Sequence, residues 1–151
     1  MTQEEKQLLL KDLCARLPYG LCIRVDDAEE YDLMESVTHR CISVYNGERK
    51  YTDKISTYNL DYHIVKPYLR PMSSMTEEEK EELKELIDSE EVDEKGVYFL
   101  EGGTLEDYLS EFSYKLCNII NDWLNAHHFD YRGLIEKGLA LPAPEKMYKF
   151  D

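Results

Sequence analysis

The densest group of reactive side chains in the chain lies between residues 127 and 132, as His127-His128-Phe129-Asp130-Tyr131-Arg132. Two imidazoles, a carboxylate and a guanidinium this close together suit metal binding or proton transfer. Neighbouring histidines on a helix point about 100° apart, so His127 and His128 do not share a face as a zinc pair four residues apart does. A metal would therefore need distant ligands such as Cys117 or His63. A structural role or a partner-binding surface fits better, with histidines favoured at a helix C-terminus and Asp130 pairing locally with Arg132.

A second candidate segment is Lys66-Pro67-Tyr68-Leu69-Arg70-Pro71-Met72, in which proline holds the chain extended. It suits a rigid connector whose Tyr68, Leu69 and Met72 seal a sheet against helices, or a contact surface for another molecule. Both segments together give the candidate partner-binding residues Tyr68, Arg70, His127, His128, Asp130, Tyr131 and Arg132.

The chain carries no recognisable catalytic motif. Its four cysteines, Cys14, Cys22, Cys41 and Cys117, show no Cys-x-x-Cys spacing and are expected to be small buried apolar residues of a reducing compartment. It has no Gly-x-Ser-x-Gly, and Gly102-Gly103 stands alone, so no phosphate loop is indicated. We therefore predict no catalytic residue, metal or cofactor. The alternative is a small enzyme or metal-dependent hydrolase centred on His127, His128 and Asp130.

The elements that must position these residues begin with a helix at residues 3–16. Thr2 and Glu5 form a capping box, Leu9, Leu13 and Leu17 share one apolar face, and Pro18-Tyr19-Gly20 ends the helix.

Residues 21–66 alternate and turn like short strands. Leu21, Ile23 and Val25 alternate with polar or small residues, residues 31–37 suit a second strand, and 62–66 suit a last one. Between them, residues 40–45 and 48–52 flank Asn46-Gly47, which favours a two-residue hairpin turn. We predict a small, curled antiparallel sheet or an open barrel.

The second half of the chain is predicted to be largely helical. Thr76 and Glu79 open an acidic amphipathic helix with another capping box, residues 97–100 suit a short strand, and the apolar spacing from Leu105 to Leu124 predicts a long helix. Residues 132–137 suit a short helix ended by Gly138. The prediction is one α+β domain, 1–151, with three main helices: N-terminal helix 3–16, sheet region 21–66, connector 67–75, helical region 76–138 and extended tail 139–151.

The charge of the chain excludes several classes of partner. With 32 acidic against 18 basic residues the net charge is −14, which disfavours direct nucleic-acid or membrane-surface binding. The first residues lack a secretory signal and no window approaches a membrane span, so we expect a cytoplasmic protein. The acids gather at 26–35 and 73–95. If both blocks shared one face, they would resemble a phosphate backbone and attract a basic protein.

Three blocks of the sequence carry a resemblance: residues 2–20, residues 65–76, and residues 123–141 followed by Ala143-Pro144-Glu145. They resemble an uncharacterised family of small acidic hypothetical proteins from gut anaerobic bacteria and their phages. The resemblance implies a compact cytoplasmic protein carried on mobile elements, and it transfers no activity, cofactor or catalytic residue. We therefore expect a non-enzymatic protein-interaction or accessory factor of phage or mobile-element type that binds a host protein.

Overall fold

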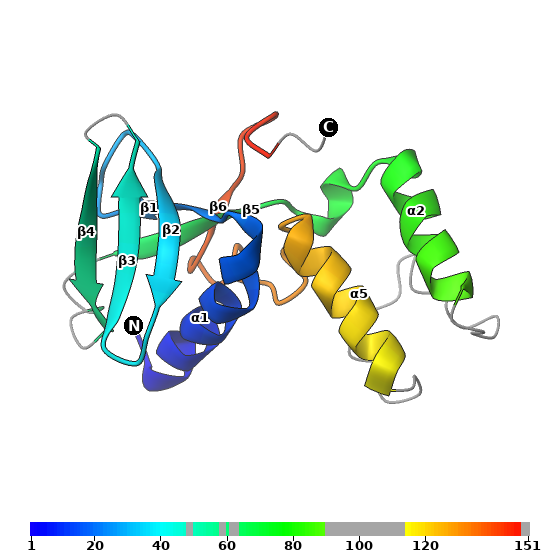
Figure 1. Ribbon diagram of the computed structural model, residues 1–151, viewed down its shortest axis with the longest axis horizontal. Coiled ribbons are helices and arrows are strands. Elements are labelled where there is room, and N and C mark those ends of the chain that lie inside the picture. The colour runs from blue at the N-terminus through cyan, green and yellow to red at the C-terminus, as the bar shows by residue number, and fades with distance from the viewer. Residues whose placement is uncertain (48–49, 58–59, 61–63, 90–113, 149–151) are drawn as a thin grey trace.

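The computed structural model describes residues 1–47, 50–57, 60, 64–89 and 114–148. It contains three helices, α1 (Gln3–Arg16), α2 (Glu77–Asp88) and α5 (Tyr114–Ala126), and one open six-stranded sheet in the order β4-β3-β2-β1-β5-β6 (Figure 1). The predicted α+β class, with a sheet packed against helices, is confirmed.

Neighbouring strands of the sheet follow one another in the chain from β1 to β4, and the tail of the chain adds the last strand at the opposite edge. Its strands are β1 (Cys22–Val25), β2 (Asp32–Val37), β3 (Cys41–Asn46), β4 (Tyr51–Ser56), β5 (Val65–Leu69) and β6 (Leu141–Pro142). Strands β1 to β5 pair antiparallel, but Tyr68 in β5 pairs parallel with Leu141 in β6. The antiparallel sheet predicted for residues 21–66 is confirmed, and the parallel pair adds a strand that was not predicted. The extended tail supplies this strand, β6. No local sequence pattern indicates a pairing between segments so far apart in the chain.

The predicted hairpin is confirmed, but its turn is longer than expected. Asn46 pairs with Tyr51, so residues 47–50 form the connection, and Lys50 rather than Asn46 adopts a positive φ of 54°. Asn46 is the last residue of β3 instead, and its side-chain amide donates a hydrogen bond to Asp32 Oδ1 at 2.8 Å.

Both capping boxes are confirmed, at Thr2 with Glu5 and at Thr76 with Glu79. The predicted connector 67–75 is partly strand, because β5 continues to Leu69 before a short 3-10 helix, η3 (Met72–Ser74). The helix predicted at 132–137 is wrong, since this segment consists of turns. The strand predicted at 97–100 and the first part of the helix predicted from Leu105 lie outside the described residues.

Two clusters of buried side chains hold these elements together. In the first, α1 packs on what we call the inner face of the sheet, the face that carries Ile23, Met34, Ile42, Val44 and Ile55. The second joins α2 and α5 through Leu83, Ile87, Leu116, Ile120, Trp123, Leu124 and Phe129. Figure 1 shows the sheet with α1 at one end of the long axis and α2 at the other. Among the described residues no helix is long and apolar enough to cross a membrane.

Candidate functional site

The two segments that carry the candidate residues lie side by side. The amide of Arg70 donates to the carbonyl of His128 at 2.8 Å, and the amide of Asp130 donates to the carbonyl of Arg70 at 2.8 Å. Two backbone hydrogen bonds thus join the residue after β5 to the loop that follows α5.

Arg132 and Tyr131 take part in a buried network of charged side chains. Asp12 and Arg16 on α1 are both fully buried; Arg16 Nε donates to Asp12 Oδ2 at 2.8 Å and Arg16 Nη2 donates to the carbonyl of Phe129 at 2.8 Å. Arg132 Nη1 donates to the same carboxylate, at Asp12 Oδ1, at 2.6 Å. Its guanidinium lies 4.4 Å from the centroid of the Tyr131 ring. The predicted pair between Arg132 and Asp130 is wrong. Arg132 binds Asp12 instead and so links the loop after α5 to α1.

Sequence reasoning missed Asp12 and Arg16, although a signal was present. Both residues fall on the apolar face of α1, between and beside Leu9 and Leu13, at spacings of three and four residues. An acid and a base four residues apart on a face otherwise apolar indicate a buried pair rather than a solvated one.

His128, His127 and Asp130 point to different partners. His128 is 1% exposed, its Nε2 donates to the carbonyl of Tyr19 at 3.1 Å, and its ring stacks on Tyr148 at 3.8 Å. Burial, together with the positive charge of Arg16, lowers the pKa of His128 to about 4, so the ring is neutral at pH 7. His127 stacks on Trp123, with ring centroids 3.9 Å apart.

The carboxylate of Asp130 accepts hydrogen bonds from the amides of Leu134 and Ile135, both at 2.8 Å. It therefore holds the turns that replace the expected helix at 132–137. Within the described ranges, no three His, Cys, Asp or Glu side chains come together as a group able to hold a metal ion. The geometry gives the hydrolase alternative no support.

Arg70 also serves the interior of the protein. Its Nη1 and Nη2 donate to Glu79 Oε1 and Oε2 at 2.6 and 2.8 Å, and its guanidinium lies 4.2 Å from the centroid of the Phe129 ring. Burial by itself raises the pKa of Glu79, but hydrogen bonds from Arg70 and Thr76 and the charge of Arg70 outweigh it and lower that pKa below its ordinary value. Arg70 thus joins β5 to α2.

Tyr68 lies on the face of the sheet opposite α1. Its ring lies edge-on to the ring of Tyr31, with the ring centroids 6.5 Å apart. We call this face of the sheet, opposite α1, the outer face. Strand register places Leu33 between Cys22 and Tyr45 on this face, and Arg24 beside Lys66. The outer-face patch is defined by Tyr31, Leu33, Tyr45, Ile64 and Tyr68, with Arg24 and Lys66.

Three of these patch residues are unusually exposed for their size. Tyr31 is 54% exposed, Ile64 47% and Leu33 42%, and Met1 is the remaining large apolar side chain described as exposed. The outer face therefore presents apolar side chains to solvent beside two basic ones.

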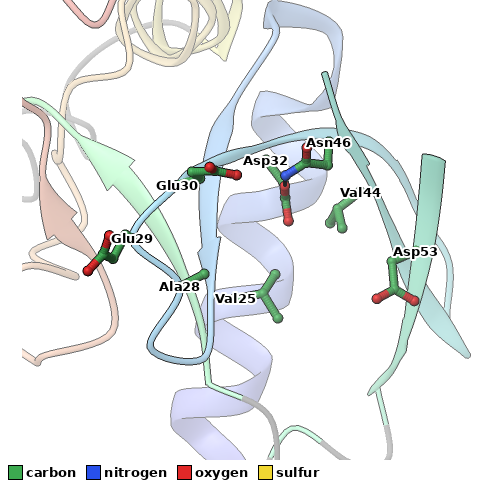
Figure 2. A pocket seen from close by; sticks show the side chains of 8 residues that line it. All are labelled: Val25, Ala28, Glu29, Glu30, Asp32, Val44, Asn46 and Asp53. Carbon is green, nitrogen blue, oxygen red and sulfur yellow. Dashed lines mark hydrogen bonds between the residues drawn. The ribbon is translucent and has the colours of Figure 1, made fainter. Parts of the chain in front are cut away.

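An acidic pocket opens at the opposite, inner face of the same sheet. Its volume is about 340 Å³, and Figure 2 shows the acidic residues that line it, Glu29 and Glu30 from the β1–β2 loop, Asp32 and Asp53, together with Val25 and Val44. Such a pocket suits a positive charge. Glu29, Glu30 and Asp32 belong to the first acidic block, whereas α2 carries part of the second at the far end of the molecule (Figure 1). The described parts of the two blocks do not form one continuous acidic face.

The cysteines differ from the expectation of uniform burial. Cys22 is buried, Cys41 and Cys117 are half-buried, and Cys14 is exposed on α1. Cys14 lies beside Leu13 in sequence but falls off the apolar face of the helix. Burial also raises the pKa of the Cys22 thiol, which keeps it protonated and unreactive.

Comparisons with known proteins identify no family for this chain. No protein-family model matches the chain, and neither the curated proteins nor the solved structures give a significant match.

Proposed function

We propose that the protein is a non-enzymatic interaction factor that binds a partner protein through the outer-face patch. The observation that carries the proposal is the concentration of exposed apolar side chains, Tyr31, Leu33 and Ile64, on the sheet face away from α1. Exposed apolar side chains gathered in one place mark interaction surfaces, whereas single ones are ordinary.

The residue types in the patch suit a protein partner. Tyrosine and arginine are enriched among the residues that dominate binding energy, and the patch combines three tyrosines with Arg24. Arg24, Tyr45 and Tyr68 stand on paired strands and Tyr31 directly precedes β2, so little backbone ordering is needed on binding.

Charge on this face indicates what the partner presents. By strand register the outer face carries the basic residues Arg24, Lys54 and Lys66, and Glu35 joins it through a hydrogen bond from Thr52 Oγ1 at 3.1 Å. The face is therefore positive although the chain as a whole is strongly acidic. We infer a partner with an acidic rim around an apolar centre. The resemblance to proteins of gut anaerobes and their phages supports a cytoplasmic accessory role of phage or mobile-element type, with a host protein as the partner.

Affinity capture from a lysate of a gut anaerobe, quantified by mass spectrometry, tests the proposal with two variants at the same positions. Tyr31→Ser/Leu33→Ser removes the apolar surface, and Tyr31→Phe/Leu33→Met keeps it. We expect a partner that the wild type enriches to be retained by the second variant and reduced about tenfold or more by the first, equivalent to about 1.4 kcal/mol.

Circular dichroism of both variants establishes that they fold alike. If every protein captured by the wild type is captured equally by Tyr31→Ser/Leu33→Ser, the outer-face patch is not the binding surface and the proposal fails.

A further inference from the structure

A second concave surface lies away from the outer face, between the segment after β5, the first turns of α2 and the tail after β6. This groove has a volume of about 1040 Å³ and includes Pro71, Glu78, Glu82, Pro144, Glu145 and Tyr148 in its lining. It is too large for a single ion or side chain and is of a size to take several residues of an extended chain.

Internal contacts fix the walls of the groove. The Arg70–Glu79 ion pair and the Thr76 capping box hold the start of α2 against β5. On the tail side, the hydroxyl of Tyr148 donates to the carbonyl of Tyr68 at 2.8 Å and its ring stacks on His128. All of these contacts are made within the chain itself, so its own fold positions the walls of the groove.

The charge of the lining is negative. Arg70 pairs with Glu79 within the wall, and Glu82 Oε1 accepts a hydrogen bond from Trp123 Nε1 at 3.0 Å. Of the other charged side chains in the described lining, Glu78 and Glu145 are acidic and Lys146 is basic, so the lining as a whole keeps a negative charge. Proline and tyrosine surfaces beside these carboxylates suit the alkyl stems of lysine or arginine.

The tail offers little for recognition by strand addition. Pro142 and Pro144 have no amide hydrogen, and Ala143 already donates its own to the carbonyl of Leu69 at 2.8 Å. A ligand must therefore be recognised through its side chains, which makes charge the main determinant of its identity.

We propose that this groove binds an extended, lysine- or arginine-rich segment of a partner polypeptide. The site is separate from the outer-face patch and has the opposite charge preference, so the protein carries two binding surfaces for chemically different segments.

Fluorescence anisotropy tests the groove with a labelled octapeptide of alternating lysine and alanine, and with a second peptide in which glutamate replaces lysine. The groove variant is Glu78→Lys/Glu145→Lys, and Glu81→Lys/Glu136→Lys has the same net charge with both changes at exposed positions outside the lining. At about 0.1 M salt, where the Debye length is about 10 Å, charges outside the groove are largely screened.

We expect the wild type to bind the lysine peptide and not the glutamate peptide, with affinity reduced about tenfold or more in the groove variant and less than about threefold in the control. Tyr31→Ser/Leu33→Ser should bind as the wild type does, which separates this site from the outer-face patch.

Three results would overturn the groove assignment. The first would be that the wild type fails to bind the lysine peptide. The second would be that both charge-reversed variants weaken binding equally. The third would be that Asp32→Asn/Asp53→Asn in the acidic pocket abolishes binding while the groove variant retains it. The second result indicates general attraction to an acidic protein, and the third moves the site to the inner face of the sheet. Circular dichroism of every variant confirms that the comparison is between folded proteins.

Discussion

At the scale of single residues, His128 shows how a reactive side chain becomes structural. It adopts a left-handed backbone conformation with φ of 58°, which turns its ring inward between Tyr19 and Tyr148. Asparagine tolerates this conformation better than most residues do. The ring is neutral in the folded protein because burial and Arg16 lower its pKa to about 4.

This low pKa predicts a loss of stability in mild acid. The ordinary pKa of His128 is 6.5, so between pH 6.5 and 4 the unfolded chain binds a proton that the folded protein does not. From these two values, the free energy of unfolding should fall by about 2 kcal/mol between pH 7.5 and 5 because of this group. Urea denaturation at the two pH values measures the change.

The control is His128→Asn, which keeps a residue suited to the left-handed position and removes the titrating ring. Its stability should depend less on pH over the same range. Glu79 does not interfere, because its pKa lies below its ordinary value of 4.5 and its contribution is lost only in stronger acid. Equal pH dependence in variant and wild type would show that another group is responsible.

The sequence identified the reactive residues of the junction but not their partners. Adjacent histidines pointing apart on a helix were reason enough to doubt a metal site. That Arg132 binds Asp12 depends on how the loop after α5 meets α1, and that Arg70 binds Glu79 depends on how the end of β5 meets α2. Those contacts join segments up to 120 positions apart, a separation that local patterns do not encode.

At the scale of elements, the hydroxyl of Tyr148 is inserted between two strands. It accepts a hydrogen bond from the amide of Cys22 in β1 at 3.1 Å and donates to the carbonyl of Tyr68 in β5 at 2.8 Å. One side chain from the tail thereby completes the ladder between β1 and β5. Burial raises the pKa of Tyr148 well above its ordinary value, so the hydroxyl stays protonated and able to donate.

Tyr148→Phe should therefore destabilise the protein by about 1–3 kcal/mol, because it leaves a strand amide and a strand carbonyl without this partner. Chemical denaturation measures the loss. Tyr31→Phe is the matched control, since it removes a tyrosine hydroxyl from an exposed side chain and should change stability by less than about 0.5 kcal/mol. Similar values for the two variants would mean that water replaces the Tyr148 hydroxyl.

Elements with local signals were predictable from the sequence. The two capping boxes fix the starts of α1 and α2 because side chain and amide lie three residues apart. The β3–β4 hairpin follows from alternation on both sides of a turn. The parallel strand β6 was not predictable, because Leu141 and Pro142 look like any extended tail until β5 lies beside them.

At the scale of the whole molecule, one loop links the two clusters of buried side chains. Phe129 packs in the cluster of α2 and α5, while Leu134 and Leu139, a few residues later, pack in the cluster of α1 and the sheet. Arg16 from α1 binds the carbonyl of Phe129. The single domain stays a prediction, and these links are the reason to expect that the two clusters unfold together.

We therefore expect one cooperative unfolding transition. Trp123 is the only tryptophan of the chain and lies in the cluster of α2 and α5, so its fluorescence reports on that cluster, while far-UV circular dichroism reports on all elements. The two denaturation midpoints should coincide. A fluorescence transition clearly separated from the dichroism transition would show that the two clusters unfold as separate units.

The pairing of β5 with β6 also has a consequence for the protein during its synthesis. Translation at about 5–20 residues per second takes roughly 4–15 s to proceed from Leu69 to Pro142, and during that time the nascent chain has no β6 to cover β5. An uncovered strand edge invites pairing with other chains. Because Asp26 donates to the carbonyl of Ile64, alternation along β5 turns the nitrogen of Pro67 away from β1, toward the waiting edge. Proline offers no hydrogen there, so this position cannot donate to a neighbouring strand before β6 is made, which weakens mispairing at the open edge.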